Sequence, residues 1–349
     1  MIMPMSEQDA FKVLNGMFLD TPLDPLRISP NETVTLTHGP EAADDCAISE
    51  VRIGKDTLLM VQTIDFVRGK GFELYEKGYL TAYDLGWYVV GANLSDIAAM
   101  GALPHTVQMV VRYPKDADAS EFKQIMKGAN ECAQKYGAHI SGGDTGSYST
   151  SVLAASATGF TSPDRLLTQS GAMPGQDVWL SGPTGLAAAA RLATSLDGIT
   201  PQTTTDYEEL FKVWRRVDPQ IGAGRAVTKV QSVAAGTDTS DGLKVALENI
   251  ARKSGVNIAV EQEAIPIHPA VRRVAEALGH DALAIVCGNS VDFRLLFTAG
   301  EGNRAQISET FRKKGLAEPH RIGSVYEGEG AATFYDGRPL PGEIETHVA

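Results

Sequence analysis

Residues 93–101 read Asn-Leu-Ser-Asp-Ile-Ala-Ala-Met-Gly and close a stretch that begins at Leu80. Apolar residues recur in this stretch at spacings of three to five, which predicts a helix over residues 80–100. Asn93 and Asp96 are three residues apart and therefore lie on one face of that helix. An aspartate inside a helical pattern is hard to explain as a turn or cap residue, so Asp96 is a candidate for function.

Working outward from this helix, aspartates follow apolar stretches at several other places along the chain. Their segments read AADDCA (42–47), QTIDF (62–66), SGGDTGS (141–147) and GTDTSDG (236–242). Taken singly, each has a simple explanation, because aspartate favours turns and helix N-caps. Asp241, which precedes Gly242 and an amphipathic stretch, is the clearest N-cap candidate.

A fold that brought these carboxylates together would have to offset their repulsion. Two unit charges ~4 Å apart repel by about 4 kcal/mol at an effective dielectric of ~20. Magnesium suits sites in which single carboxylates share the ion with substrate phosphates. The set of aspartates therefore points to ATP-dependent phosphoryl chemistry.

Length and composition indicate a globular protein with two domains. The chain has 349 residues, of which 43% are hydrophobic and 21% charged, and single cores stop growing near ~250–300 residues. A formal charge of −12 disfavours nucleic acid and anionic membranes as partners. The N-terminus lacks a signal-peptide pattern and no stretch reaches the length of a membrane span, so a cytoplasmic protein is expected.

Strand and helix patterns alternate along the chain, which predicts an α/β (α+β) fold. A domain boundary near residue 165 would divide it into domains of residues 1–165 and 166–349. Further helices are expected at 10–20, 119–136 and 269–278, and strands at 57–65, 105–113, 151–160 and 178–180. In the 141–147 segment, a strand is expected to end in a tight turn around Asp144.

Other chemical signatures are weak. The chain has neither a P-loop nor a dinucleotide-binding fingerprint, and its seven histidines show no zinc-ligand spacing. Residues 181–185 (SGPTG) precede an Ala-rich helix and could bind an anion, although a packing loop is the simpler interpretation. The three cysteines are expected to be small buried side chains: Cys46, Cys132 and Cys287.

The order of these motifs resembles thiamine-monophosphate kinase. That family belongs to the superfamily of aminoimidazole ribonucleotide synthetase, selenophosphate synthetase and the hydrogenase-maturation dehydratase. The resemblance covers about residues 35–300 and rests on DDCAI (44–48), TID (63–65), NLSDIAAMGALP (93–104), GGDTGS (142–147), SGAMPGQDVWLSG (170–182) and TSDGL (239–243).

The resemblance implies an N-terminal domain whose strands pair across a homodimer and a C-terminal α/β domain. It also implies an ATP site with several magnesium ions in the cleft between them. The positions that match metal ligands are Asp45, Thr63, Asp65, Asp96, Asp144, Asp238 and Asp241. Those that match contacts to ATP are Gly143, Asp144 and Ser240.

The chain departs from the family where the acceptor is recognised. Val291 stands in place of a substrate-contacting Glu, and GKGF (69–72) lacks the His of the family's GVHF. Gln169 replaces a nucleotide-contacting Arg, and residues 340–349 show no recognisable thiamine-packing aromatic. Because a polar site discriminates strongly against ligands that lack its partner, an altered acceptor is expected.

Three hypotheses remain. The first is an ATP-dependent kinase that acts on thiamine monophosphate or another small polar metabolite. The second is an ATP-dependent ligase or cyclo-ligase that activates an amide or carbonyl oxygen. The third is a non-catalytic nucleotide-binding dimer, which Gln169 favours most. A selenophosphate synthetase is disfavoured because the first 45 residues contain no cysteine.

Overall fold

The computed structural model describes residues 24–39, 42–67, 69–204 and 207–342. The α/β fold predicted from the sequence is confirmed: two separate β-sheets are packed with helices. The helix predicted at 10–20 lies outside the described residues.

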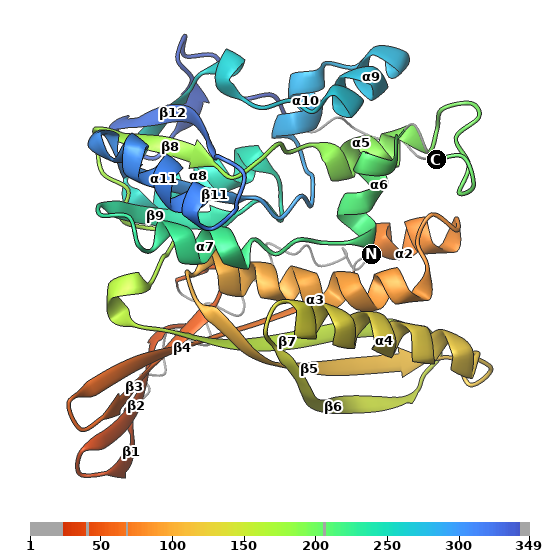
Figure 1. The fold of residues 1–349 in the computed structure, drawn as a ribbon, viewed down its shortest axis with the longest axis horizontal. Helices are drawn as coiled ribbons and strands as arrows, with labels where there is room; N and C mark the ends of the chain where they lie inside the picture. Colours follow the sequence, from red (N-terminus) through yellow and green to blue (C-terminus); the bar gives the residue numbers. More distant parts are fainter. Residues whose placement is uncertain (1–23, 40–41, 68, 205–206, 343–349) are drawn as a thin grey trace, which may run out of the picture.

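The helix predicted over residues 80–100 is α3 (Ala82–Ala99), and it lies at the centre of the molecule (Figure 1). It begins with a capping box, in which the Asp84 amide donates to the Thr81 hydroxyl and the Thr81 amide donates to the Asp84 carboxylate. Nearly all of its residues are buried, because strands β4 (Asp56–Phe66) and β7 (Val152–Thr161) cover one side and helices α6 (Glu208–Arg215) and α7 (Ile221–Val227) the other.

The first sheet contains seven strands in the order β1-β2-β3-β4-β7-β5-β6. Its neighbouring strands are antiparallel, apart from the parallel pair β5–β6. The remaining strands of this sheet are β1 (Leu26–Ser29), β2 (Glu32–His38), β3 (Ala47–Ile53), β5 (Leu103–Tyr113) and β6 (His139–Ser147); the helices beside it include α2 (Gly69–Glu76) and α4 (Ala119–Lys135).

Helices α3 and α4 cover one face of this sheet (Figure 1). They approach each other backbone to backbone at two glycines. A Cβ on Gly86 would stand 1.9 Å from the Ile125 carbonyl oxygen, and a Cβ on Gly128 would stand 1.9 Å from that of Tyr83. The close crossing is possible because neither glycine has a side chain.

Among the described residues, no helix packs on the opposite face of the sheet, which carries exposed apolar side chains. Paired residues on neighbouring strands share a face, and the register places these side chains on the same side of the sheet. We call this surface the bare face; its exposed apolar residues are Leu26, Ile28, Leu36, Ile53, Leu58, Ile64, Phe66, Leu103 and Val110.

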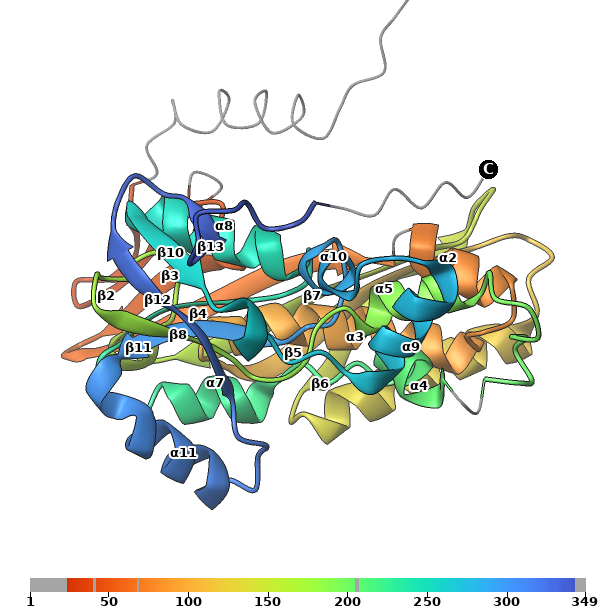
Figure 2. The same ribbon diagram turned by 90° about the horizontal axis from the view of Figure 1, so that it is seen from above.

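The second sheet contains six strands in the order β13-β10-β12-β8-β11-β9. Figures 1 and 2 show it on the other side of α3 from the first sheet. Its strands are β8 (Gln176–Leu180), β9 (Val233–Asp238), β10 (Val256–Val260), β11 (Leu295–Gly300), β12 (His320–Glu327) and β13 (Ala332–Phe334). The helices in this part of the chain are α5 (Leu186–Ala193), α6 (Glu208–Arg215), α7 (Ile221–Val227), α8 (Leu243–Ser254), α9 (Pro269–Leu278), α10 (Ala282–Cys287) and α11 (Arg304–Lys313).

Most of the predicted elements are confirmed, including β4, β5, β7, β8, α4 and α9. The tight turn predicted around Asp144 is wrong, because residues 139–147 form one continuous strand, β6. The three cysteines are buried, as predicted. Residue 165 falls between the last strand of the first sheet and the first strand of the second, and the domain boundary there stays a prediction.

Candidate active site

Three carboxyl groups, one of them buried and two half-buried, meet where the two sheets approach α3. Asp45 lies in the loop before β3, Asp96 in the last turns of α3, and Asp238 at the end of β9. The Asp238 carboxylate raises the pKa of both Asp45 and Asp96, and the Asp45 carboxylate raises that of Asp96. We call these three residues the acidic cluster; the structure brings them together from positions almost two hundred residues apart in the sequence.

Hydroxyl groups orient the carboxylates of the cluster. The Thr63 hydroxyl, on β4, donates to Asp96 Oδ2 at 2.6 Å. Asp238 accepts from the Ser95 hydroxyl on α3 and from the Ser240 hydroxyl, the latter at 2.7 Å. The Ser95–Asp238 bond joins α3 to β9, so the cluster sits on a link between the two halves of the molecule.

Burial is the largest cause of the raised pKa values in the cluster. It raises the pKa of Asp96 well above its usual range, and the charges of Asp238 and Asp45 add to the effect. The pKa of Asp45 is raised by burial and then by the same kind of repulsion. At neutral pH these groups therefore oppose one another's ionisation, and a cation would relieve that opposition.

Asp45 shows how such a cation would be held. Its Oδ1 accepts hydrogen bonds from Gln169 Nε2 at 2.7 Å and from the Thr237 hydroxyl at 2.9 Å. Its Oδ2 is buried and has no hydrogen-bond partner. An orphaned buried carboxylate oxygen is costly, and an oxygen ligand of this type suits magnesium.

The cluster is not a preformed protein cage. Across the described ranges, no three His, Cys, Asp or Glu side chains converge closely enough to hold one ion. Magnesium commonly takes only one or two carboxylates and completes its shell with water and substrate phosphates. The arrangement of single carboxylates beside hydroxyls fits that mode.

Two further predicted ligands lie at the edge of the cluster. The Asp65 amide, near the end of β4, donates to Asn93 Oδ1 at 3.1 Å, which ties this strand to α3. The Asp65 carboxylate raises the pKa of Asp96, and that of Asp241 raises the pKa of Asp238. The N-cap role expected for Asp241 is wrong, because Gly242 occupies the N-cap position of α8.

Asp144 is the predicted ligand that the structure keeps away from the cluster. It is exposed on β6 and forms an ion pair with Arg112 of β5, which lowers its pKa. Val110, its register partner, belongs to the bare face, whereas Thr63 and Asp65 alternate with the bare-face residues of β4 and so point to the α3 side. Gly143, beside Asp144 on β6, also lies outside the cluster, because β7 and β5 separate its strand from β4.

The N-terminus of α5, considered above as an anion site, is filled by the protein itself. The buried Asp292 carboxylate accepts hydrogen bonds from the amides of Gly185 at 2.5 Å and Ala187 at 2.9 Å. Residues 181–185 are thus a packing loop. Val291, next to this carboxylate, packs its apolar side chain against the core.

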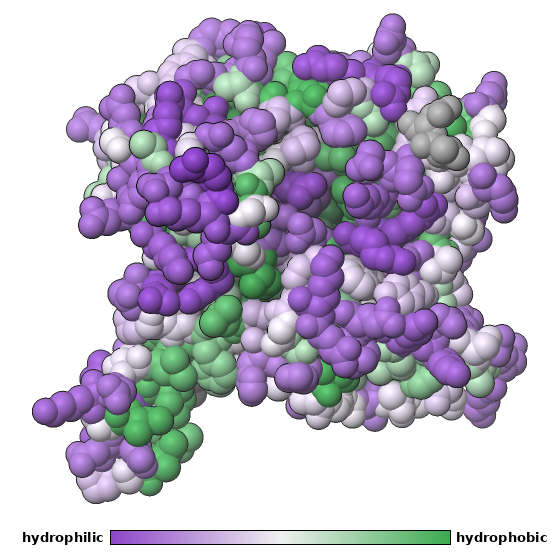
Figure 3. All heavy atoms as spheres, viewed as in Figure 1, coloured by the Kyte–Doolittle hydropathy of each residue, from purple (hydrophilic) through white to green (hydrophobic). Residues whose placement is uncertain are grey.

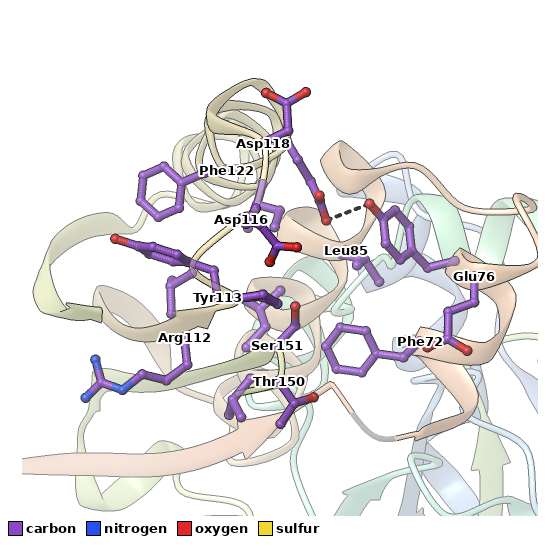
Figure 4. A pocket seen from close by; sticks show the side chains of 18 of the residues that line it. Phe72, Glu76, Leu85, Arg112, Tyr113, Asp116, Asp118, Phe122, Thr150 and Ser151 are labelled. Atoms are coloured by element: carbon purple, nitrogen blue, oxygen red, sulfur yellow. Dashed lines mark hydrogen bonds between the residues drawn. The ribbon is translucent and has the colours of Figure 1, made fainter. Parts of the chain in front are cut away.

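A cavity of about 630 Å³ lies between α2, α4 and the end of β5 (Figure 4). Aromatic side chains line it, and the Tyr75 hydroxyl donates to the Glu121 carboxylate across it at 2.7 Å. Arg112, the ion-pair partner of Asp144, stands at its edge. It contains no member of the acidic cluster, so it is a separate space on the flank of the first sheet.

Sequence reasoning missed three residues of the site. Ser95 lies within the motif that contains Asp96, but a serine in a helix carries no signal of its own. Thr237 precedes Asp238, and a threonine in a strand carries no such signal either. Lys253, which contacts Gln169, lies among basic residues of a kind that commonly occurs at solvent-exposed helix ends.

Comparison with known proteins agrees with this geometry. Residues 43–161 match the family of AIR synthase related proteins, N-terminal domain. The chain is 31% identical over 252 residues to the thiamine-monophosphate kinase of Pyrococcus horikoshii, covering 72% of this chain and 74% of that protein. It is 28% identical over 297 residues to that of Escherichia coli K12, covering 85% and 87%.

Solved structures show the same fold over nearly the whole chain. The thiamine-monophosphate kinase of Stenotrophomonas maltophilia K279a has a TM-score of 0.72 at 27% identity, with 95% of this chain and 96% of that chain covered. AaThiL complexed with AMPPCP and TMP has a TM-score of 0.74 at 22% identity, with 99% and 96% covered.

Fold and sequence thus place the chain among the AIR synthase-like proteins. Within that class, the chain belongs to the thiamine-monophosphate kinase family. The expected resemblance is confirmed, and the protein is an ATP-dependent kinase. Among the described helices, none combines the length and the apolar character needed to cross a membrane.

Proposed function

We propose that the protein transfers the γ-phosphoryl group of magnesium-bound ATP to the phosphate of thiamine monophosphate. Family membership supports the reaction, and the related AaThiL has been solved with AMPPCP and TMP. The observation that carries the proposal is the acidic cluster, in which carboxylates oppose one another and Asp45 keeps one oxygen free.

In this proposal the predicted residues divide into two groups. Magnesium, when bound, would neutralise charge on the ATP phosphates and bring them to the acceptor. The residues that would hold it are Asp45, Thr63, Asp65, Asp96, Asp238 and Asp241. Ser240, whose amide and hydroxyl fix Asp238, would contact the nucleotide, with Gly143 and Asp144 contributing from β6.

The protein's own contribution is to position the reactants and to exclude water. Phosphoryl transfer needs no covalent nucleophile from the enzyme, because catalysis rests on alignment and on charge stabilisation. Thr63 and Ser95 fix the orientation of the carboxylates they contact. Because the Ser95–Asp238 bond spans α3 and β9, the relative placement of the two sheets determines the geometry of the site.

The identity of the phosphate acceptor is the more specific part of the proposal. Val291 offers no polar group to a ligand, since its side chain packs against the core. The altered acceptor pocket expected from the sequence is therefore still a prediction, and relatives named for thiamine monophosphate make that compound the first acceptor to test.

We further propose that a second copy of the chain covers the bare face. Its apolar side chains are strongly exposed, with Ile64 at 74%, Ile28 at 64% and Leu26 at 63%. Figure 3 shows apolar side chains gathered on the projecting end of the first sheet. Contiguous apolar patches of this kind mark interaction surfaces, and a twofold dimer would bury the same patch on both copies.

The test is a magnesium-dependent assay of ADP release with thiamine monophosphate as acceptor, followed by analysis of the products. We expect ADP and thiamine diphosphate in equal amounts. Release of free phosphate with a new covalent product would instead identify a ligase. Tight magnesium–ATP binding without turnover on thiamine monophosphate or a panel of small phosphorylated metabolites would identify a non-catalytic dimer and refute the kinase proposal.

A further inference from the structure

Lys253, at the C-terminal end of α8, reaches the loop that carries Asp45. Its ammonium group donates to Gln169 Oε1 at 2.5 Å and to the backbone carbonyl oxygen of Ala43. Ala43 has a φ of 45°, a left-handed conformation that is uncommon for alanine. Lys253 thus holds both the turn before Asp45 and the segment between the two sheets.

Gln169 transmits this contact to the acidic cluster. Its side chain is only 5% exposed, and its Nε2 donates to Asp45 Oδ1 and to the Thr237 hydroxyl at 3.1 Å. An ammonium group can only donate hydrogen bonds. Lys253 therefore selects the orientation of the Gln169 amide in which Oε1 faces the lysine and Nε2 faces Asp45.

The orientation of this amide decides which oxygen of Asp45 is free. With Nε2 toward the cluster, Oδ1 is engaged by two donors and Oδ2 is left without a partner. If the amide turned over, its carbonyl oxygen would face the carboxylate and repel it. Asp45 would then lose a donor and its fixed orientation.

We propose that Lys253 is a positioning residue for the metal site: it orients Gln169 so that Asp45 presents Oδ2 to magnesium. The inference rests on the proposed function, because it assumes that Asp45 is a metal ligand. The backbone amide of Gln169 also donates to Asp44, at 3.0 Å, so the same segment holds both aspartates. Groups that orient metal ligands in this way typically change metal affinity by about 10–100-fold when removed.

The variant Lys253→Met keeps the aliphatic stem and removes the ammonium group. We expect it to raise the magnesium concentration for half-maximal ATP binding by about tenfold or more, measured by titration calorimetry. We also expect it to weaken the upward shift of melting temperature that magnesium causes in the absence of ATP. Lys253→Arg, which can donate to both carbonyl oxygens, should stay close to the unmodified protein.

Lys244→Met is the matched control, since Lys244 is also on α8 and pairs only loosely with Glu248, at 3.9 Å. It should leave the magnesium dependence unchanged. The double variant Gln169→Ala/Lys253→Met tests whether Lys253 acts through Gln169. If it does, adding Lys253→Met to Gln169→Ala should have little further effect on the magnesium dependence of ATP binding.

Two results would overturn the inference. One is a Lys253→Met protein whose melting temperature falls while its magnesium dependence stays normal, which would make the lysine purely structural. The other is full additivity of the two substitutions. Failure of the proposed function looks different, because then the unmodified protein itself would show no magnesium-dependent binding of ATP.

Discussion

At the scale of single residues, the site is built from groups that are unfavourable alone. Burial and repulsion from neighbouring carboxylates raise the pKa values of Asp45, Asp96 and Asp238, so the protein without a cation carries an electrostatic cost there. The hydroxyls of Thr63 and Ser95 reduce that cost and fix the carboxylates. Such a site trades stability of the free protein for affinity toward a divalent cation.

Asp96→Asn should separate these two effects. Removing the charge ends its repulsion with Asp238 and Asp45, so at neutral pH the free energy of unfolding should be unchanged or higher. Magnesium-dependent binding of ATP should fall by at least about tenfold. Urea unfolding and titration calorimetry measure the two quantities, and Asp56→Asn, at an exposed position on β4, is the control.

Unchanged ATP affinity in Asp96→Asn would mean that the cluster is not the metal site. A large loss of stability would also contradict the interpretation, since it would show that the charged form of Asp96 stabilises the fold.

Single residues also show what sequence can reveal. Asp96 could be identified because a carboxylate inside an apolar helical pattern has no local explanation. The contact between Lys253 and Gln169 could not, because it joins positions 84 residues apart and neither residue type stands out where it occurs. Long-range polar contacts of this kind depend on how the two sheets are placed.

At the scale of elements, the sequence predicts helices and strands well where caps and periodicity agree. Helix α9 spans 269–278 as predicted, because Pro269 favours the first turn and Gly279 adopts the left-handed conformation that ends it. In the 141–147 segment, the sequence predicts a strand that ends in a tight turn around Asp144, yet β6 continues to Ser147. Glycine usually signals a turn, but here it permits the close approach of β5.

The two glycines of β6 allow a direct test of that explanation. Both have a φ that other residues rarely adopt, 141° for Gly142 and 142° for Gly143. A Cβ on Gly143 would lie 1.8 Å from the Met109 carbonyl oxygen, whereas one on Gly142 would meet nothing within 4 Å. Gly142→Ala should therefore lower the free energy of unfolding by about 1–2 kcal/mol through backbone strain alone.

Gly143→Ala should cost about 1–3 kcal/mol more, since the backbone of β5 has to move. Urea denaturation of the two variants gives the difference directly. Because the two positions have nearly the same φ, the contribution of backbone strain cancels in that difference. Equal losses of stability would show that the contact with Met109 does not constrain this strand.

At the scale of the whole molecule, the alternation of apolar and polar residues predicts strands with two different faces but does not say what covers each face. In the structure, α3 and α4 cover one face and leave Ile64 and Phe66 exposed on the other. Only the three-dimensional arrangement shows that Thr63 and Asp65 lie on the covered side while Asp144 lies on the bare face. The prediction that Asp144 shares one site with the other aspartates therefore depends on whether a second copy of the chain binds to the first.

Within one chain, β7 and β5 lie between β4 and β6. With neighbouring strands about 4.8 Å apart, Asp144 is displaced sideways from the strand of Asp65 by roughly 14 Å, and it points to the other face of the sheet. We therefore predict that a shared role in binding ATP phosphates depends on the proposed second copy, with the Asp144 of one subunit serving the acidic cluster of the other.

Mixing two inactive variants tests this arrangement. Asp96→Asn and Asp144→Asn proteins should each lack activity alone. In a mixed dimer, one site would contain both substitutions and the other would contain neither. If subunits exchange at random, half of the dimers are mixed, so a 1:1 mixture should recover about one quarter of the activity of the unmodified protein. If both residues serve the same subunit's site, every site in the mixture carries one substitution and no activity returns; an active Asp144→Asn protein would equally exclude a role for Asp144.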